Sequence, residues 1–85
     1  MSNTNNNVLF LGAVKGARKT DGRNFYILAF GVPSTRDGVF GLESANVFTD
    51  ENTYNDFVSH AKPGTYYGFT VHYSRGGWDL ISYKF

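Results

Sequence analysis

Apolar residues alternate with polar ones along much of the chain, in a pattern that is typical of β-strands. The runs 8–17 and 24–32 are rich in β-branched, leucine and aromatic residues, and the polar stretch between them contains Asp21-Gly22. An Asp-Gly pair between two such runs indicates a hairpin, because glycine takes positive φ without a steric clash. Three later runs have the same character. The pattern predicts strands at 8–17, 24–32, 39–49, 65–74 and 78–85.

One segment follows the period of a helix instead. In the run 50–61, the apolar residues recur at i, i+3, i+4 and i+7, at Tyr54, Phe57, Val58 and Ala61. This spacing places them on one face of a helix. Thr49 or Asp50 can cap the helix at its start, and Lys62-Pro63-Gly64 ends it. The sequence therefore predicts one short helix between the third and fourth strands.

The predicted order is strand-strand-strand-helix-strand-strand. This is the order of the OB-fold, an all-β class with one short helix in which five strands form a Greek-key barrel, β-β-β-α-β-β. An SH3-like barrel ranks second, because that fold does not usually place a helix of this length between its third and fourth strands. The chain has 85 residues, enough for one domain. We expect a disordered N-terminal segment at 1–7, which is polar and uncharged, and a single OB-fold domain at 8–85.

Composition restricts the chemistry that the chain can perform. Cysteine is absent and histidine occurs twice, so there is no disulfide, no cysteine nucleophile and no three-histidine metal site. No spacing links a base, an acid and a phosphate clamp, so we expect no enzyme activity, no cofactor, no metal and no small-molecule substrate. Aromatic residues form 18% of the chain, which is more than a small core can hide. Some of these rings should therefore lie at the surface.

Charge is segregated along the chain although the net charge is only +1. Residues 15–36 hold five basic side chains and a single acid, whereas residues 37–61 hold five acids and no Lys or Arg. One part of the surface should therefore be basic and another acidic. The basic part lies on the first hairpin and the following loop, where it could face a polyanion. No apolar run is long enough to span a bilayer, so we expect no membrane association and a cytoplasmic protein.

Two short motifs resemble a known group of proteins. Asp21-Gly22-Arg23-Asn24-Phe25-Tyr26 resembles a Gly-basic-x-aromatic step into the second strand, and Lys62-Pro63-Gly64-Thr65-Tyr66 resembles a Pro-Gly-x-Tyr entry into the fourth. Both steps are found in small OB-fold single-stranded DNA-binding proteins, above all in the phage replication proteins typified by the filamentous-phage gene V protein. The chain departs from this group in its clear helix at 50–61. It also lacks the acidic C-terminal tail that bacterial single-stranded DNA-binding proteins use to recruit enzymes.

The resemblance implies a sequence-tolerant protein that coats and protects single-stranded DNA during replication. It further implies a homodimer, located in the host cytoplasm if the protein is phage-encoded. In this group Arg23 would lie near a phosphate, Phe25 or Tyr26 would stack on a base, and Tyr73 and Trp78 would help to cover bound bases.

The residues themselves support the same chemistry, because single-strand binding needs rings for the bases and cations for the phosphates. Phe25 and Tyr26 point to opposite faces of one strand, and the pattern does not show which of them is displayed, since both faces are apolar. Either ring, and Trp78, could instead belong to the core. The candidate nucleic-acid-binding residues are Lys15, Arg18, Lys19, Arg23, Phe25, Tyr26, Arg36, Tyr73, Arg75 and Trp78.

Three other functions remain open at this stage. An OB domain could bind RNA through the same stacking face, since only contacts to the 2′-hydroxyl would distinguish the two nucleic acids. A small β-barrel with exposed aromatics could bind a partner protein, with an affinity that depends little on salt. A small nuclease is the least supported alternative, because no nucleophile motif is present.

Overall fold

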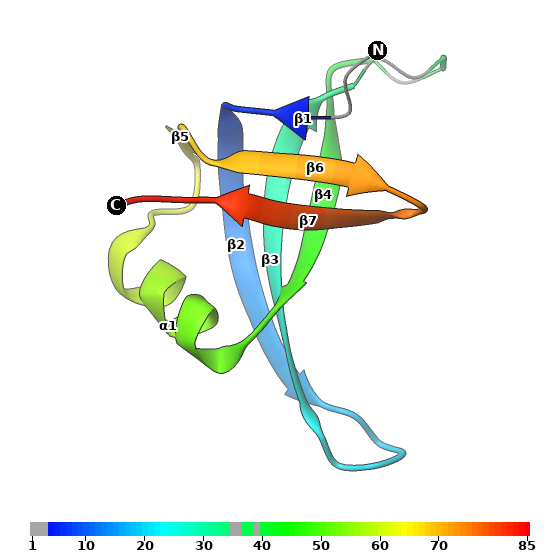
Figure 1. The fold of residues 1–85 in the computed structure, drawn as a ribbon, viewed down its shortest axis with the longest axis vertical. Coiled ribbons are helices and arrows are strands. Elements are labelled where there is room, and N and C mark those ends of the chain that lie inside the picture. The colour runs from blue at the N-terminus through cyan, green and yellow to red at the C-terminus, as the bar shows by residue number, and fades with distance from the viewer. Residues whose placement is uncertain (1–3, 35–36, 39) are drawn as a thin grey trace.

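The computed structural model describes residues 4–34, 37–38 and 40–85, so Arg36 lies outside the described residues. Most of these residues are in strands, and one helix follows the third long strand (Figure 1). The elements in chain order are β1 (Thr4–Asn5), β2 (Val8–Ala17), β3 (Asn24–Pro33), β4 (Leu42–Thr49), α1 (Glu51–His60), β5 (Thr65–Tyr67), β6 (Thr70–Ser74) and β7 (Gly77–Ser82). The all-β class with one short helix is therefore confirmed.

The strands form one seven-stranded sheet in the order β1-β6-β7-β4-β3-β2-β5. Neighbours are antiparallel except β4 and β7, which are parallel and meet at the single register pair Val47 and Trp78. The sheet is open, with β1 and β5 at its two edges. The prediction of a five-stranded Greek-key barrel is therefore not confirmed.

Two differences from the sequence prediction account for the extra strands. The run 65–74, predicted as one strand, is divided at Gly68 and Phe69 because its halves pair with different neighbours: β5 pairs with β2, and β6 pairs with β7. The sequence also predicted no structure before Val8, whereas β1 pairs Thr4 with His72 and Asn5 with Val71. A side-chain hydrogen bond of 2.8 Å joins Thr4 Oγ1 and His72 Nδ1.

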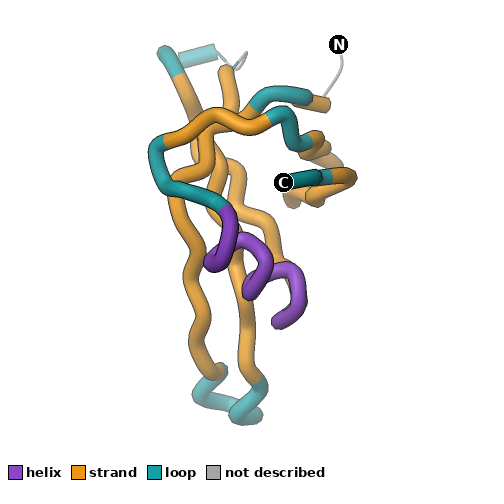
Figure 2. Tube along the Cα trace, turned by 90° about the vertical axis from the view of Figure 1, so that its left-hand side faces the viewer, coloured by secondary structure: helices purple, strands orange, loops and turns teal. Residues whose placement is uncertain are grey.

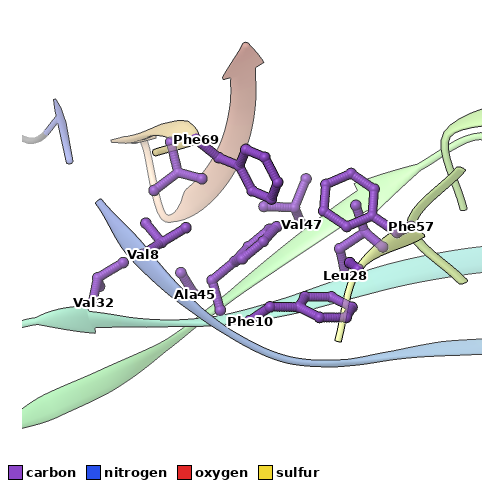
Figure 3. Close-up of a cluster of buried hydrophobic side chains, with 11 residues drawn as sticks. Val8, Phe10, Leu28, Val32, Ala45, Val47, Phe57 and Phe69 are labelled. Atoms are coloured by element: carbon purple, nitrogen blue, oxygen red, sulfur yellow. The ribbon is translucent and has the colours of Figure 1, made fainter. Parts of the chain in front are cut away.

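The core lies between the long strands, α1 and the C-terminal hairpin (Figure 3). Its buried members include Leu28 and Phe30 from β3, Val47 from β4 and Phe69 from the connection between β5 and β6. Phe57 of α1 is also fully buried, and its ring centroid lies between 4.9 and 5.8 Å from the rings of Phe10, Phe30, Phe69, Tyr83 and Phe85. Aromatic packing therefore joins the helix to both parts of the sheet.

The helix begins where the sequence predicted it. Asp50 is the N-cap, and its Oδ1 accepts a hydrogen bond of 2.8 Å from the backbone N–H of Thr53. This bond favours the ionised carboxylate and holds the pKa of Asp50 below its ordinary value of 3.8. The helix and the C-terminal segment lie on one side of the long β2–β3 hairpin, and no described element covers the other side (Figure 2).

Candidate nucleic-acid interface

Burial along β3 shows which of its residues face the uncovered side of the sheet. Leu28 and Phe30 are fully buried, so the even-numbered positions of β3 face the core. Phe25 and Ile27 therefore point to the uncovered side, and Tyr26 points toward the helix. The choice between Phe25 and Tyr26, which the sequence left open, is settled in favour of Phe25.

We call this uncovered surface the outer face. Side chains that point to it alternate with core residues along three neighbouring strands: Val14 on β2, Phe25 and Ile27 on β3, and Leu42, Ser44, Asn46 and Phe48 on β4. Ile27 is the register partner of both Val14 and Phe48. Phe48 is 69% exposed and Val14 is 53% exposed. The outer face is therefore a largely apolar surface, with Ser44 and Asn46 as polar members, that is open to solvent.

Phe25 lies against the backbone of the neighbouring strand. Its register partner is Gly16, and a Cβ atom at Gly16 would lie 2.6 Å from Phe25 Cζ and 2.9 Å from Cε1. Such distances are well inside van der Waals contact, so the absence of a side chain at Gly16 is what lets the ring settle there. The ring is thus supported from below by β2 while it remains partly exposed.

The hairpin between β2 and β3 carries three exposed cations, Arg18, Lys19 and Arg23, at its far end. Its loop is closed by backbone hydrogen bonds from Arg18 N to Arg23 O (2.8 Å) and from Gly22 N to Arg18 O (2.9 Å). Asp21 accepts a 3.0 Å hydrogen bond from the Arg23 N–H, and its carboxylate is 3.9 Å from Arg23 Nε. Because the Arg23 side chain is 83% exposed, this ion pair is weak and leaves the guanidinium accessible.

Tyr26 and Lys15, two other candidates on this hairpin, are register partners that face the helix side of the sheet. The Tyr26 hydroxyl donates a 2.7 Å hydrogen bond to Glu51 Oε2, and its ring packs against Tyr54. The hydrogen bond to Glu51 raises the pKa of the Tyr26 phenol above its usual value. The structure therefore separates Tyr26 and Lys15 from the outer face.

The β6–β7 hairpin brings together Tyr73 and Trp78, whose ring centroids are 5.2 Å apart. Trp78 was expected to be exposed if it contacts bases, but it is half-buried and packs against the edge of the core. Arg75 occupies the turn with a positive φ of 48°, a backbone conformation that residues other than glycine rarely adopt. Its exposed guanidinium lies at the tip of this second hairpin.

A groove of about 510 Å³ lies between the outer face and this hairpin. Its lining residues are Ser44, Asn46, Phe48, Tyr73, Gly76, Gly77, Trp78 and Asp79. Phe25 and the groove are thus parts of one surface, bounded by the cations of the first hairpin and by Arg75 of the second.

Sequence reasoning missed Phe48 and Asn46 as candidates. The signal was present, because both alternate with the buried Ala45 and Val47 along β4. Because the small apolar residues Ala45 and Val47 lie on the core side of β4, the larger Phe48 lies on the outer face. Packing in the core therefore does not account for an aromatic residue at this position.

The described residues contain no group of three or more His, Asp or Glu side chains arranged to hold a metal ion. In the same ranges, 4–34, 37–38 and 40–85, no helix has the length and apolar character needed to cross a membrane. The arrangement offers stacking surfaces, cations and hydrogen-bonding groups. Comparisons of the chain with family models, with curated proteins and with solved structures find no match to any of them.

Proposed function

We propose that this protein binds single-stranded DNA through the outer face and does not act as an enzyme. One observation carries the proposal: an exposed apolar and aromatic sheet face lies between two hairpins that both present arginine side chains. Unpaired bases have flat apolar faces, and they alternate along the strand with negative phosphates. A surface of this composition complements both.

The topology supports assignment to the OB-fold class, which we infer as the finer description. β2 pairs with both β3 and β5, β4 lies parallel to β7, and α1 connects β4 to β5. β5 lies at one edge of the sheet and β6 lies next to the other edge, yet the two strands are consecutive in the chain. A single segment, interrupted at Gly68 and Phe69, therefore connects the two ends of the sheet. OB-folds bind single strands on the sheet face between their hairpin loops.

In this mechanism Phe25 and Phe48 each stack on a base, with Ile27 filling the space between them. Each stacked base contributes about 1–3 kcal/mol, as measured by truncation of the ring. Arg18, Arg23 and Arg75 contact phosphates and release the counterions bound there, so binding weakens as salt increases. No contact in this set reads base identity, which agrees with the proposed tolerance for sequence.

The biological role is proposed from the motif resemblance. The protein would coat and protect single strands during replication, as a homodimer, in the cytoplasm of a phage-infected host. Light scattering of the free protein tests the dimer, and electron microscopy of protein on long single strands tests the coating.

The decisive experiment is a titration with fluorescent oligo-dT at low and moderate salt, which also follows the emission of Trp78. We expect saturable binding, quenching of Trp78 because it lines the groove, and a steep salt dependence. The Arg23→Ala variant should lower the salt slope by about 1. Absence of binding at low salt would refute the proposed function.

The second candidate is binding of a partner protein through the same face, which the high exposure of Phe48 also favours. Such binding would depend little on salt and would not require the arginines of the hairpins. Oligo-rU in the same titration tests the RNA alternative, since stacking alone does not distinguish the sugars.

A further inference from the structure

The groove beside the β6–β7 hairpin has an unexpected charge for a DNA-binding surface. Its lining includes three aromatic residues, Phe48, Tyr73 and Trp78. Among the described residues that line it, Asp79 is the one with a charged side chain. A carboxylate repels phosphate, so this groove suits a different part of a nucleotide.

Asp79 points away from the core, because the residues on either side of it, Trp78 and Leu80, pack against the core. It is exposed, and within the described part of the chain its carboxylate makes no hydrogen bond or ion pair. Its register partner on β6 is His72, whose Nδ1 is already 2.8 Å from Thr4 Oγ1. The oxygens of Asp79 are therefore available to a ligand, and an ionised carboxylate only accepts hydrogen bonds.

Asn46 supplies the complementary group. Its Oδ1 accepts a hydrogen bond of 3.2 Å from Ser44 Oγ, which leaves the amide N–H groups to donate elsewhere. Asn46 is exposed and lines the same groove as Asp79. Asp79 and Asn46 thus supply an acceptor and a donor to a groove that aromatic residues also line.

We propose that this groove is a subsite for one nucleobase that carries an exocyclic amino group, with Asp79 accepting a hydrogen bond from that group. The inference rests on the single-stranded DNA binding proposed above and adds a preference to it. Cytosine presents an amino group next to a ring nitrogen that accepts, which matches the acceptor of Asp79 and the donor of Asn46. Thymine has a carbonyl oxygen in place of the amino group, so its O4 would face the carboxylate.

The test compares oligo-dC with oligo-dT of equal length, at slightly alkaline pH where cytosine stays unprotonated. The readout is the ratio of the two dissociation constants, because phosphate contacts are common to both ligands and cancel. A single carboxylate contact in an exposed groove should favour oligo-dC by about 3- to 10-fold. In Asp79→Asn the ratio should fall to about 1, because the amide can donate to O4 of thymine.

Removal of a negative charge should itself strengthen binding of both oligonucleotides, so a matched control is needed. Asp37→Asn removes one charge from an exposed turn that does not line the groove. It should leave the oligo-dC preference unchanged. Loss of the preference in Asp37→Asn would show that it reflects overall charge and would overturn the role of Asp79.

A second variant tests the groove without changing charge. Gly77 lies on the same face of β7 as Asp79, and a Cβ there would meet no atom closer than Ser74 O at 4.0 Å. Gly77→Val therefore fills the groove while the hairpin can keep its shape. It should weaken oligo-dC binding and bring the ratio to about 1, with an unchanged circular dichroism spectrum.

The outcomes separate the two proposals. Equal binding of oligo-dC and oligo-dT by the wild-type protein would overturn the subsite and leave single-strand binding standing. Failure of both oligonucleotides to bind at low salt would refute single-strand binding and the subsite with it.

Discussion

At the scale of single residues, the outer face depends on which side chains are supported and which are free. Phe48 is largely exposed, so its ring contributes little to the core and is available to a ligand. Phe25 is held in place by contact with Gly16, which fixes the orientation of the ring before any base arrives. A ring that is already ordered loses less conformational entropy when it binds.

The first prediction concerns Phe48. Phe48→Ala should weaken oligo-dT binding by about 1–3 kcal/mol, which is the range for one stacked base. The melting temperature should change little, because the ring is mostly in solvent. Val58→Ala on α1 is the control, since Val58 is also exposed but lies on the helix. A large loss of thermal stability in Phe48→Ala would instead assign the ring to the core.

The second prediction concerns Gly16. Gly16→Ala should displace the Phe25 ring and weaken oligo-dT binding, because the new Cβ would lie 2.6 Å from Phe25 Cζ. In the Phe25→Ala background the same substitution should have no further effect, since the displaced ring is gone. Fluorescence titrations of the two single variants and the double variant give this cycle. Additive losses would contradict a shared mechanism.

The third prediction concerns the cap of α1. The pKa of Asp50 is lowered in the folded protein, so the ionised carboxylate stabilises the folded state relative to the unfolded state. This stabilising effect is present above pH 3.8. That effect should be lost as the pH falls below 3.8 through the folded-state pKa. Asp50→Asn keeps a capping side chain without the titration. The difference in unfolding free energy between wild type and Asp50→Asn should therefore narrow or reverse in acid, and a constant difference would refute this account.

At the scale of elements, the two hairpins present cations in different ways. The β2–β3 hairpin has a regular loop closed by backbone hydrogen bonds, so its arginines are carried without strain. The β6–β7 hairpin places Arg75 at a φ of 48°. Strained positions of this kind cluster at functional sites.

The fourth prediction tests whether the strained backbone at Arg75 lowers stability while its side chain contributes to binding. Arg75→Asn should stabilise the protein by about 0.5–1 kcal/mol, because asparagine accepts the left-handed conformation more readily. It should also weaken single-strand binding and lower the salt slope by about 1. Urea unfolding and salt-dependent titration measure the two effects. Unchanged binding would remove Arg75 from the phosphate path, whatever the change in stability.

At the scale of the whole molecule, aromatic packing makes one unit of the long strands, the helix and the C-terminal hairpin. Phe57 of the helix is central, because its ring packs against Phe10 of the long strands and against Phe69 and Tyr83, which flank the C-terminal hairpin (Figure 3). A chain of 85 residues has little other core to compensate for a loss at this point.

The fifth prediction follows from this packing. Phe57→Ala should cost about 3–5 kcal/mol, which approaches the whole stability of many small domains. We expect loss of the cooperative thermal transition by circular dichroism. Val58→Ala, the neighbouring exposed position, should melt almost as the wild type does. A Phe57→Ala variant with a normal transition would contradict the central role of this ring.

The sequence by itself determined the elements that depend on local chemistry. The Asp21-Gly22 hairpin, the capped helix at 50–61 and its end at Lys62-Pro63-Gly64 all follow from turn residues, capping groups and period, which act over a few positions. The alternation of buried and exposed positions along β4 also determines the outward position of Phe48. The basic end of the first hairpin likewise follows from the sequence, because Arg18, Lys19 and Arg23 surround its turn.

Only the tertiary structure decided which face of β3 is displayed, because both faces of this strand carry apolar and aromatic side chains and the local pattern cannot choose between Phe25 and Tyr26. In the assembled fold Leu28 and Phe30 are buried, the Tyr26 hydroxyl donates a hydrogen bond to Glu51 Oε2, and Phe25 lies on the outer face. The division of 65–74 into β5 and β6, and the groove that Asn46 and Asp79 both line, likewise depend on the tertiary structure. Each depends on strands that are distant in sequence and adjacent in the sheet, and burial and pairing at that range are properties of the assembled fold.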